Sequence, residues 1–102
     1  SVIMARYISL QNKLDEIKEQ GKKLRRRQDF LKGERDFLID MLLTRPTRDM
    51  EAQRRLLQEW EEEIDRLEQS LAGLRNEYER YEQQQNKQKC NTRKQQKNGR
   101  FK

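Results

Sequence analysis

A seven-residue repeat of apolar residues runs along most of the chain and is interrupted at the single proline, Pro46. An apolar repeat with a mean spacing of about 3.5 residues is typical of a helix that packs along one narrow stripe. The sequence therefore predicts a long helix over residues 1–43. Before the proline, position d of the heptad is always isoleucine or leucine, at Ile3, Leu10, Ile17, Leu24, Leu31 and Leu38.

Position a of the same heptads is apolar at both ends and interrupted in the middle. Its residues are Tyr7, Leu14, Gly21, Gln28, Arg35 and Leu42. Gly21 leaves a gap in the stripe and costs about 1 kcal/mol of helix propensity relative to alanine. Gln28 and Arg35 can fix register or partner number at some cost in stability. Arg35 can instead simply extend its charged head into water, and both interpretations stay open.

The repeat returns after the proline and predicts a second helix over residues 49–86. One column reads Met50, Leu57, Ile64, Leu71 and Tyr78, and the other reads Gln53, Trp60, Leu67, Leu74 and Tyr81.

Residues 44–48 decide how the two helices are arranged. Proline lacks a backbone N–H and disfavours helical geometry at the preceding residue, so we expect a turn here. If the chain folds back, residue i faces approximately residue 92 − i, and the two stripes begin and end together. The predicted fold is all-α, with two long helices in an antiparallel coiled-coil hairpin, either alone or self-associated into a dimer or four-helix bundle. The alternative is a parallel homodimeric rod.

The charge distribution favours the hairpin. Residues 1–48 carry 12 basic and 7 acidic side chains, whereas residues 49–86 carry 5 basic and 11 acidic ones. Folding back places the basic segment along the acidic one, and surface pairs of this kind mainly select helix orientation. With 31% hydrophobic and 41% charged residues, the chain can fill a narrow stripe but not a compact core.

Apolar side chains outside the two columns gather near the end of the first helix. Exposed apolar patches of this kind usually mark a contact site, unless self-association buries them. Trp60 is a further candidate because tryptophan is enriched at binding hot spots, although its column position also fits the core. The predicted partner-binding residues are Phe30, Phe37, Ile39, Met41, Leu43 and Trp60.

Residues 87–102 lose the repeat and contain seven basic side chains and no acidic one. We expect this tail to be disordered and to attract phosphate backbones in a salt-dependent way. A purely solubilising role is the alternative. The candidate nucleic-acid contacts are Lys87, Lys89, Arg93, Lys94, Lys97, Arg100 and Lys102.

Several function classes find no support in the sequence. The chain has no histidine and only one cysteine, Cys90, and it contains no motif for a nucleotide, a metal or catalysis. We therefore expect no enzymatic activity, no cofactor and no small-molecule substrate. Without a paired cysteine or an apolar run of about 18 residues, an intracellular location without a membrane span is expected, in nucleus or cytoplasm.

The stretch from Glu34 to Leu42 resembles helix ends in two known families. It is similar to a charged-then-aromatic helix end in small coiled-coil subunits of nuclear chromatin-remodelling complexes. It is also similar to the ERDF stretch in the C-terminal dimerisation domain of microtubule end-binding proteins, which lacks a long acidic second helix. Each resemblance covers less than half of the chain, so we assign no family and transfer no residue roles.

These patterns together favour a non-enzymatic protein–protein interaction or scaffolding module, as a subunit or dimerisation domain of a larger intracellular assembly, for example a nuclear one. A parallel homodimeric rod serving as a cytoskeletal or trafficking adaptor is the alternative function. Binding of nucleic acid through the basic tail is the third.

Overall fold

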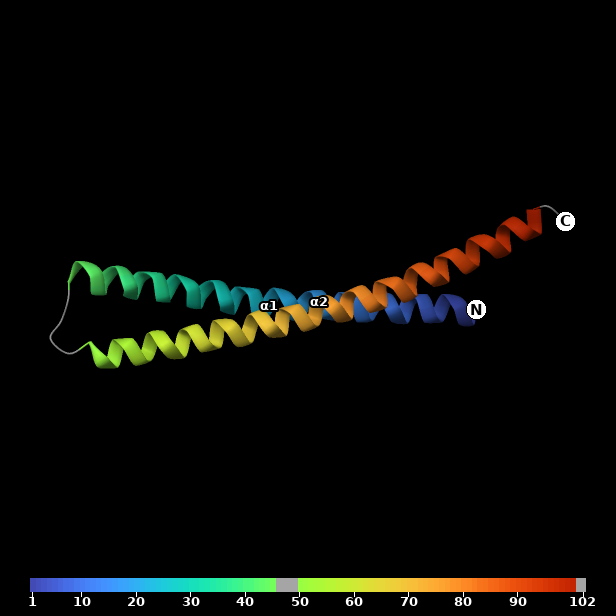
Figure 1. Ribbon diagram of the computed structural model, residues 1–102. Helices are drawn as coiled ribbons and strands as arrows, with labels where there is room; N and C mark the ends of the chain where they lie inside the picture. Colours follow the sequence, from blue (N-terminus) through green and yellow to red (C-terminus); the bar gives the residue numbers. More distant parts are fainter. Residues whose placement is uncertain (46–49, 101–102) are drawn as a thin grey trace. The chain divides into compact units, whose positions relative to one another are not determined.

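The fold is an all-α helical hairpin, which confirms the predicted fold class (Figure 1). The computed structural model describes residues 1–45 and 50–100, and describes side chains as far as Lys87. Helix α1 spans Val2–Thr44 and helix α2 spans Glu51–Arg100. The part of the chain that the structure describes contains no strand.

The ends of α1 are closed by short polar side chains. At its start, the hydroxyl of Ser1 accepts a hydrogen bond from the backbone N–H of Met4 at 3.2 Å, which satisfies one of the free donors of the first turn. At its end, the hydroxyl of Thr44 donates to the backbone carbonyl of Asp40 at 2.9 Å. The predicted turn begins within one residue of this point, but residues 46–49, which include Pro46, lie outside the described residues.

Helix α2 begins close to its predicted start and continues beyond its predicted end. Glu51 in its first turn favours the positive end of the helix dipole and forms an ion pair with Arg55 at 3.5 Å. The helix then continues to Arg100, although the loss of the repeat predicts its end near residue 86. Glutamine, lysine and arginine are good helix formers, so an established helix can propagate through this stretch without an apolar stripe.

Burial follows the two predicted columns in both helices. Every column residue from Ile3 to Leu42 and from Met50 to Tyr81 is buried or half-buried, while most of the residues between them are exposed. The most deeply buried side chain is that of Leu31, with 1% of its surface exposed. The seven-residue repeat therefore predicts the packed side of each helix correctly.

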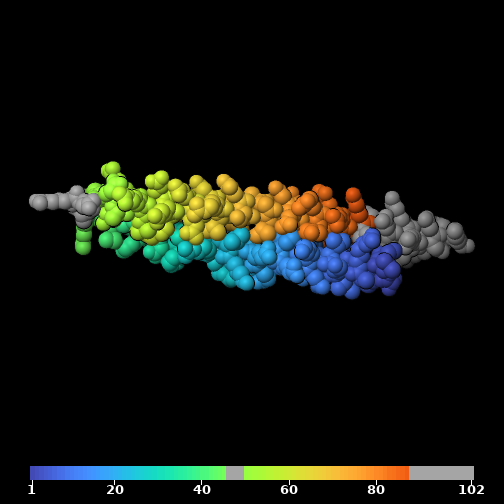
Figure 2. Space-filling model, turned by 90° about the horizontal axis from the view of Figure 1, so that it is seen from below, coloured from blue at the N-terminus to red at the C-terminus, as the bar shows by residue number. Residues whose placement is uncertain are grey.

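The chain divides into two compact units, and Gly21–Gly73 forms one of them. In this hairpin unit the second half of α1 packs against the first half of α2 (Figures 1 and 2). Leu31 and Ile64 are buried between the helices, and the guanidinium of Arg27 forms an ion pair with Glu63 at 3.2 Å. This pair joins the basic and acidic segments as the charge distribution predicts.

The other unit contains Ser1–Gln20 and the part of α2 from Leu74 onward. Leu14 and Ile17 form its apolar centre, with 2% and 6% of their surfaces exposed. The side-chain amide of Gln85 donates a hydrogen bond to the side-chain carbonyl of Gln11 at 2.6 Å. The ammonium group of Lys18 lies 5.7 Å from the ring centre of Tyr78, within the range of a cation–π contact.

Polar contacts between the helices depart from the pairing rule of 92 − i by two to four residues. In the hairpin unit, residue 28 contacts residue 68 and residue 35 contacts residue 61, which corresponds to 96 − i. Residue 27 contacts residue 63, which corresponds to 90 − i. Side chains lean toward the N-terminus of their own helix, which accounts for the displacement of the first two contacts but not for that of the contact between residues 27 and 63. The pairing of individual apolar layers stays a prediction.

Gly21 occupies its column without a neighbour that a larger side chain would displace. Apart from its chain neighbours and the nearby backbone of its own helix, a Cβ atom added at Gly21, or at Gly73 in α2, would meet no heavy atom within 4 Å. Gly21 is half-buried and Gly73 is exposed, so the two positions differ in burial but share the helical backbone.

We expect Gly21→Ala to raise the free energy of unfolding by about 1 kcal/mol, because alanine has the higher helix propensity and no clash opposes it. Gly73→Ala is the matched control and should give a gain of similar size. Urea denaturation followed by circular dichroism measures both. If Gly21→Ala alone lowers the free energy of unfolding, the position beside Gly21 is not open to a larger side chain.

Candidate interaction surface

The outward face of α1 in the hairpin unit carries two phenylalanines. Phe30 and Phe37 each precede a packed leucine, Leu31 or Leu38, by one residue, which turns their rings about 100° away from the packed stripe. The side chains of Phe30 and Phe37 are 56% and 64% exposed. Such exposure is unusual for phenylalanine, which is among the residues most often buried.

The remaining apolar candidates on α1 are also exposed, and they fall on two sides of the helix. Met41 is 43% exposed and follows Phe37 by four residues, so it continues the line of the phenylalanines. We call Phe30, Phe37 and Met41 the outer stripe. Ile39 and Leu43, at 38% and 78% exposure, lie on the opposite side of the packed stripe from Met41.

The sixth predicted residue, Trp60, differs from the others. It is half-buried and belongs to one of the two packed columns of α2. Its aromatic ring therefore contributes to the contact between the helices, as its column position predicts. A role in partner binding stays a prediction for all six residues.

Sequence reasoning missed exposed apolar residues in both units. Leu56 of α2 is 38% exposed and directly precedes the column residue Leu57. In the other unit, Val2, Met4 and Ile8 are 78%, 60% and 54% exposed. Each lies outside the a and d columns, so the heptad assignment itself could have identified them.

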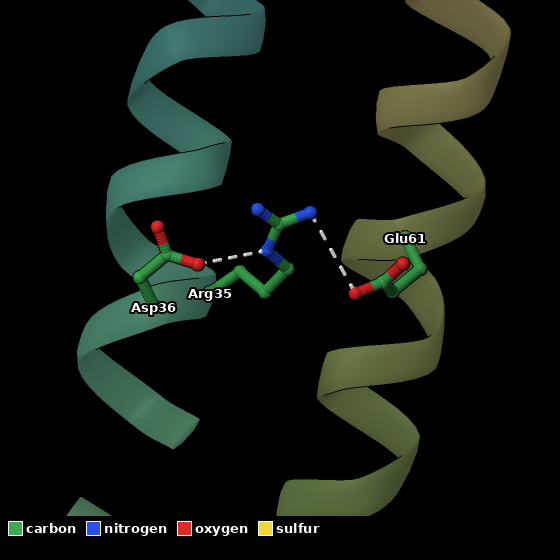
Figure 3. A network of polar contacts seen from close by, with 3 residues as sticks. All are labelled: Arg35, Asp36 and Glu61. Carbon is green, nitrogen blue, oxygen red and sulfur yellow. Dashed lines mark hydrogen bonds and ion pairs between the residues drawn. The ribbon is translucent and has the colours of Figure 1, made fainter. Parts of the chain in front are cut away.

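Arg35 combines the two interpretations that its sequence position left open. Its side chain is 24% exposed, and its Nε atom lies 3.1 Å from a carboxylate oxygen of Asp36 (Figure 3). Its Nη1 atom lies 3.8 Å from a carboxylate oxygen of Glu61 on α2 (Figure 3). The aliphatic stem thus covers the packed stripe, while the charged head reaches carboxylates on both helices.

Gln28 is a buried polar residue in the packed stripe, with 4% of its surface exposed. Its side-chain amide donates a hydrogen bond to a carboxylate oxygen of Glu68 at 2.8 Å. A hydrogen bond to a charged acceptor offsets part of the cost of burying the amide. Gln85 is a second buried polar residue, in the other unit, with 6% of its surface exposed. It continues the column of Tyr78 by one heptad, but the sequence analysis did not predict its burial.

Two further kinds of site were sought among the described residues. These residues contain no group of three or more histidine, cysteine, aspartate or glutamate side chains that could hold a metal ion. Neither helix, over its described length, has an apolar segment that could cross a membrane.

Most of the predicted nucleic-acid contacts lie where side chains are not described. Lys87 is exposed. Helix α2 includes five more of these residues, but only their backbone is described: Lys89, Arg93, Lys94, Lys97 and Arg100. The last one, Lys102, lies outside the described residues. Binding of nucleic acid by this segment stays a prediction.

Comparison with known protein families, with curated proteins and with solved structures gives no significant match for this chain.

We expect Gln28→Leu to raise the free energy of unfolding by about 1 kcal/mol, because a leucine buries more apolar surface and Glu68 keeps access to water. The same variant should broaden the distribution of oligomeric states, since a buried polar residue restricts the possible helix pairings. Urea denaturation and sedimentation velocity measure the two effects.

Leu31→Ala is the reference for a purely apolar contact and should cost about 2–5 kcal/mol. If Gln28→Leu instead lowers the free energy of unfolding, the hydrogen bond to Glu68 contributes more than the apolar contact that replaces it. Gln28 would then stabilise the hairpin rather than restrict its pairing at a cost in stability.

Proposed function

We propose that this chain is a non-enzymatic protein–protein interaction module of an intracellular assembly. The observation that carries the proposal is the exposure of Phe30, Phe37, Met41 and Leu43 on one helix end, each above 40%. Apolar surface gains about 25 cal/mol per Å² when it is removed from water, so a partner that covers these side chains binds favourably.

The two-helix fold explains why these side chains stay available. A pair of helices has one shared interface, and the a and d columns already fill it. Residues outside the columns have no further element of the chain to pack against among the described residues. A module of this kind can present a rigid helical face to a partner, which limits the entropy lost on binding.

The hairpin also separates this proposal from the adaptor rod. A parallel homodimeric rod requires α1 and α2 of one chain to point away from each other. The ion pair between Arg27 and Glu63 and the hydrogen bond between Gln28 and Glu68 join the two helices within one chain. These contacts favour a hairpin-based interaction module over a spacer.

The test is capture of a binding protein from cell extract by the tagged full chain, with chemical cross-linking and mass spectrometry to locate the contact. We expect at least one protein to be retained by the wild type and lost when Phe37 and Met41 are both changed to serine. Removing two apolar anchors should weaken binding by about 100-fold or more.

The matched control is the double variant Val2→Ser/Met4→Ser, which also removes two exposed apolar side chains but from the other unit. It should retain the same protein. Equal binding by all three chains, or loss of binding in both variants, would contradict a partner site at the 30–43 segment.

A further inference from the structure

The two helices of the hairpin unit differ in the character of their outward faces. On α1 this face carries the outer stripe of Phe30, Phe37 and Met41. On α2 the positions equivalent to those of the two phenylalanines carry Ala52, Glu59 and Arg66, all exposed, and a position equivalent to that of Met41 carries Leu56, which is 38% exposed. The larger exposed apolar side chains of this unit therefore lie on α1, and the following inference rests on the proposed function.

Two pairs of residues on the α1 face are arranged nearly symmetrically about Gly33. Phe30 lies three residues before Gly33, and Phe37 lies four residues after it. Arg26 and Asp40 lie seven residues before and seven residues after Gly33, with opposite charges. A surface with this symmetry is complementary to itself when one copy is reversed, which is the requirement of a two-fold interface.

We propose that the outer stripe binds a second copy of this chain, with the two α1 helices antiparallel and the two-fold axis beside Gly33. In this arrangement Phe30 of one copy packs against Phe37 of the other, and the pair occurs twice. Arg26 and Asp40 lie on the same side of the stripe, so each can form an ion pair with its opposite in the second copy. Among the described residues, neither side chain has an ion-pair partner within the chain.

Gly33 contributes by its lack of a side chain. It lies between the two phenylalanines on the exposed face, and a Cβ atom there would meet nothing within 4 Å. A glycine inside an exposed helix costs about 1 kcal/mol relative to alanine and gains no contact in the single chain. In the dimer it allows the two backbones to approach closely at the axis, which brings the flanking rings into contact.

A parallel pairing of the same face forms neither of these ion pairs. In a parallel pair, residues at the same height along the two helices face each other, whereas Arg26 and Asp40 lie about 21 Å apart along α1. Charge complementarity therefore favours the antiparallel dimer.

The antiparallel dimer also has one unfavourable feature. Glu34 lies next to the axis, on the side of the stripe opposite Arg26, so the two copies of Glu34 come close together. We expect Glu34→Gln to tighten the dimer about threefold, because it removes this repulsion without changing the shape of the side chain.

Sedimentation equilibrium of the purified full chain tests the proposal. The stripe is short compared with a standard interface, so we expect a dissociation constant on the order of 10 µM. Phe37→Ser should raise it about 100-fold or more. Ile8→Ser, which removes an apolar side chain of 54% exposure from the other unit, is the matched control and should leave it unchanged.

Charge exchange then tests the orientation. Arg26→Asp or Asp40→Arg alone should each raise the dissociation constant about tenfold, and the two changes in one chain should restore it to within about threefold. A parallel dimer would show no such rescue, because residues 26 and 40 lie about 21 Å apart along α1 and would not face each other.

Disulfide cross-linking locates the axis in chains that carry Cys90→Ser. Gly33→Cys should form a disulfide between two copies, because the two positions meet at the axis. Lys23→Cys should not cross-link with itself, but should do so with Thr44→Cys in a mixture, since residues 23 and 44 lie on opposite sides of the axis. Self-cross-linking of Lys23→Cys would overturn the antiparallel arrangement.

The outcomes separate this inference from the proposed function. A chain that stays monomeric at about 500 µM overturns the dimer, and capture of a partner that depends on Phe37 and Met41 would then still support an interaction module for another protein. A dimer that is insensitive to Phe37→Ser overturns the assignment of the outer stripe. Dimer formation with the expected rescue and cross-links supports the inference.

Discussion

The burial of one narrow apolar stripe on each helix is the interaction on which the structure depends. The chain is 41% charged and can fill only a strip between two helices. Side chains such as Leu14 and Leu31, at 2% and 1% exposure, each contribute about 1.5–3 kcal/mol when fully buried. An exposed ion pair such as Arg27–Glu63 contributes at most about 1 kcal/mol. The stripe therefore provides the stability, and the charges mainly determine how the helices pair.

The buried polar residues inside the stripe determine the register in which the two helices pack. Gln28 bonds to Glu68, and Gln85 bonds to Gln11, each across the two helices of its own unit. An apolar layer tolerates many neighbours, whereas a buried amide requires a specific partner to offset its desolvation. These residues restrict the register of the hairpin. Because the stripe uses the apolar residues of one side only, Phe30 and Phe37 on the outer side are left for another molecule.

The sequence predicts the packed side of both helices because the seven-residue repeat is a direct consequence of helix geometry. It predicts the exposure of Phe30 and Phe37 for the same reason, since they lie outside the columns. The repeat does not predict which carboxylates Arg35 reaches, because long side chains lean along the helix by about a turn. Gln85 and the continuation of α2 to Arg100 were missed because neither depends on apolar residues. Partner identity follows from none of these patterns.

A distance between spin labels on Ala5 and Asn86 tests the hairpin most directly, because the hairpin determines which side chains are packed and which are exposed. Both residues are exposed and belong to the same unit. Labelled chains diluted into an excess of unlabelled chains report the distance within one molecule. The hairpin predicts a single short distance, on the order of 10–20 Å, as for two packed helices. A distance on the order of 100 Å, as a continuous helix requires, would contradict the account.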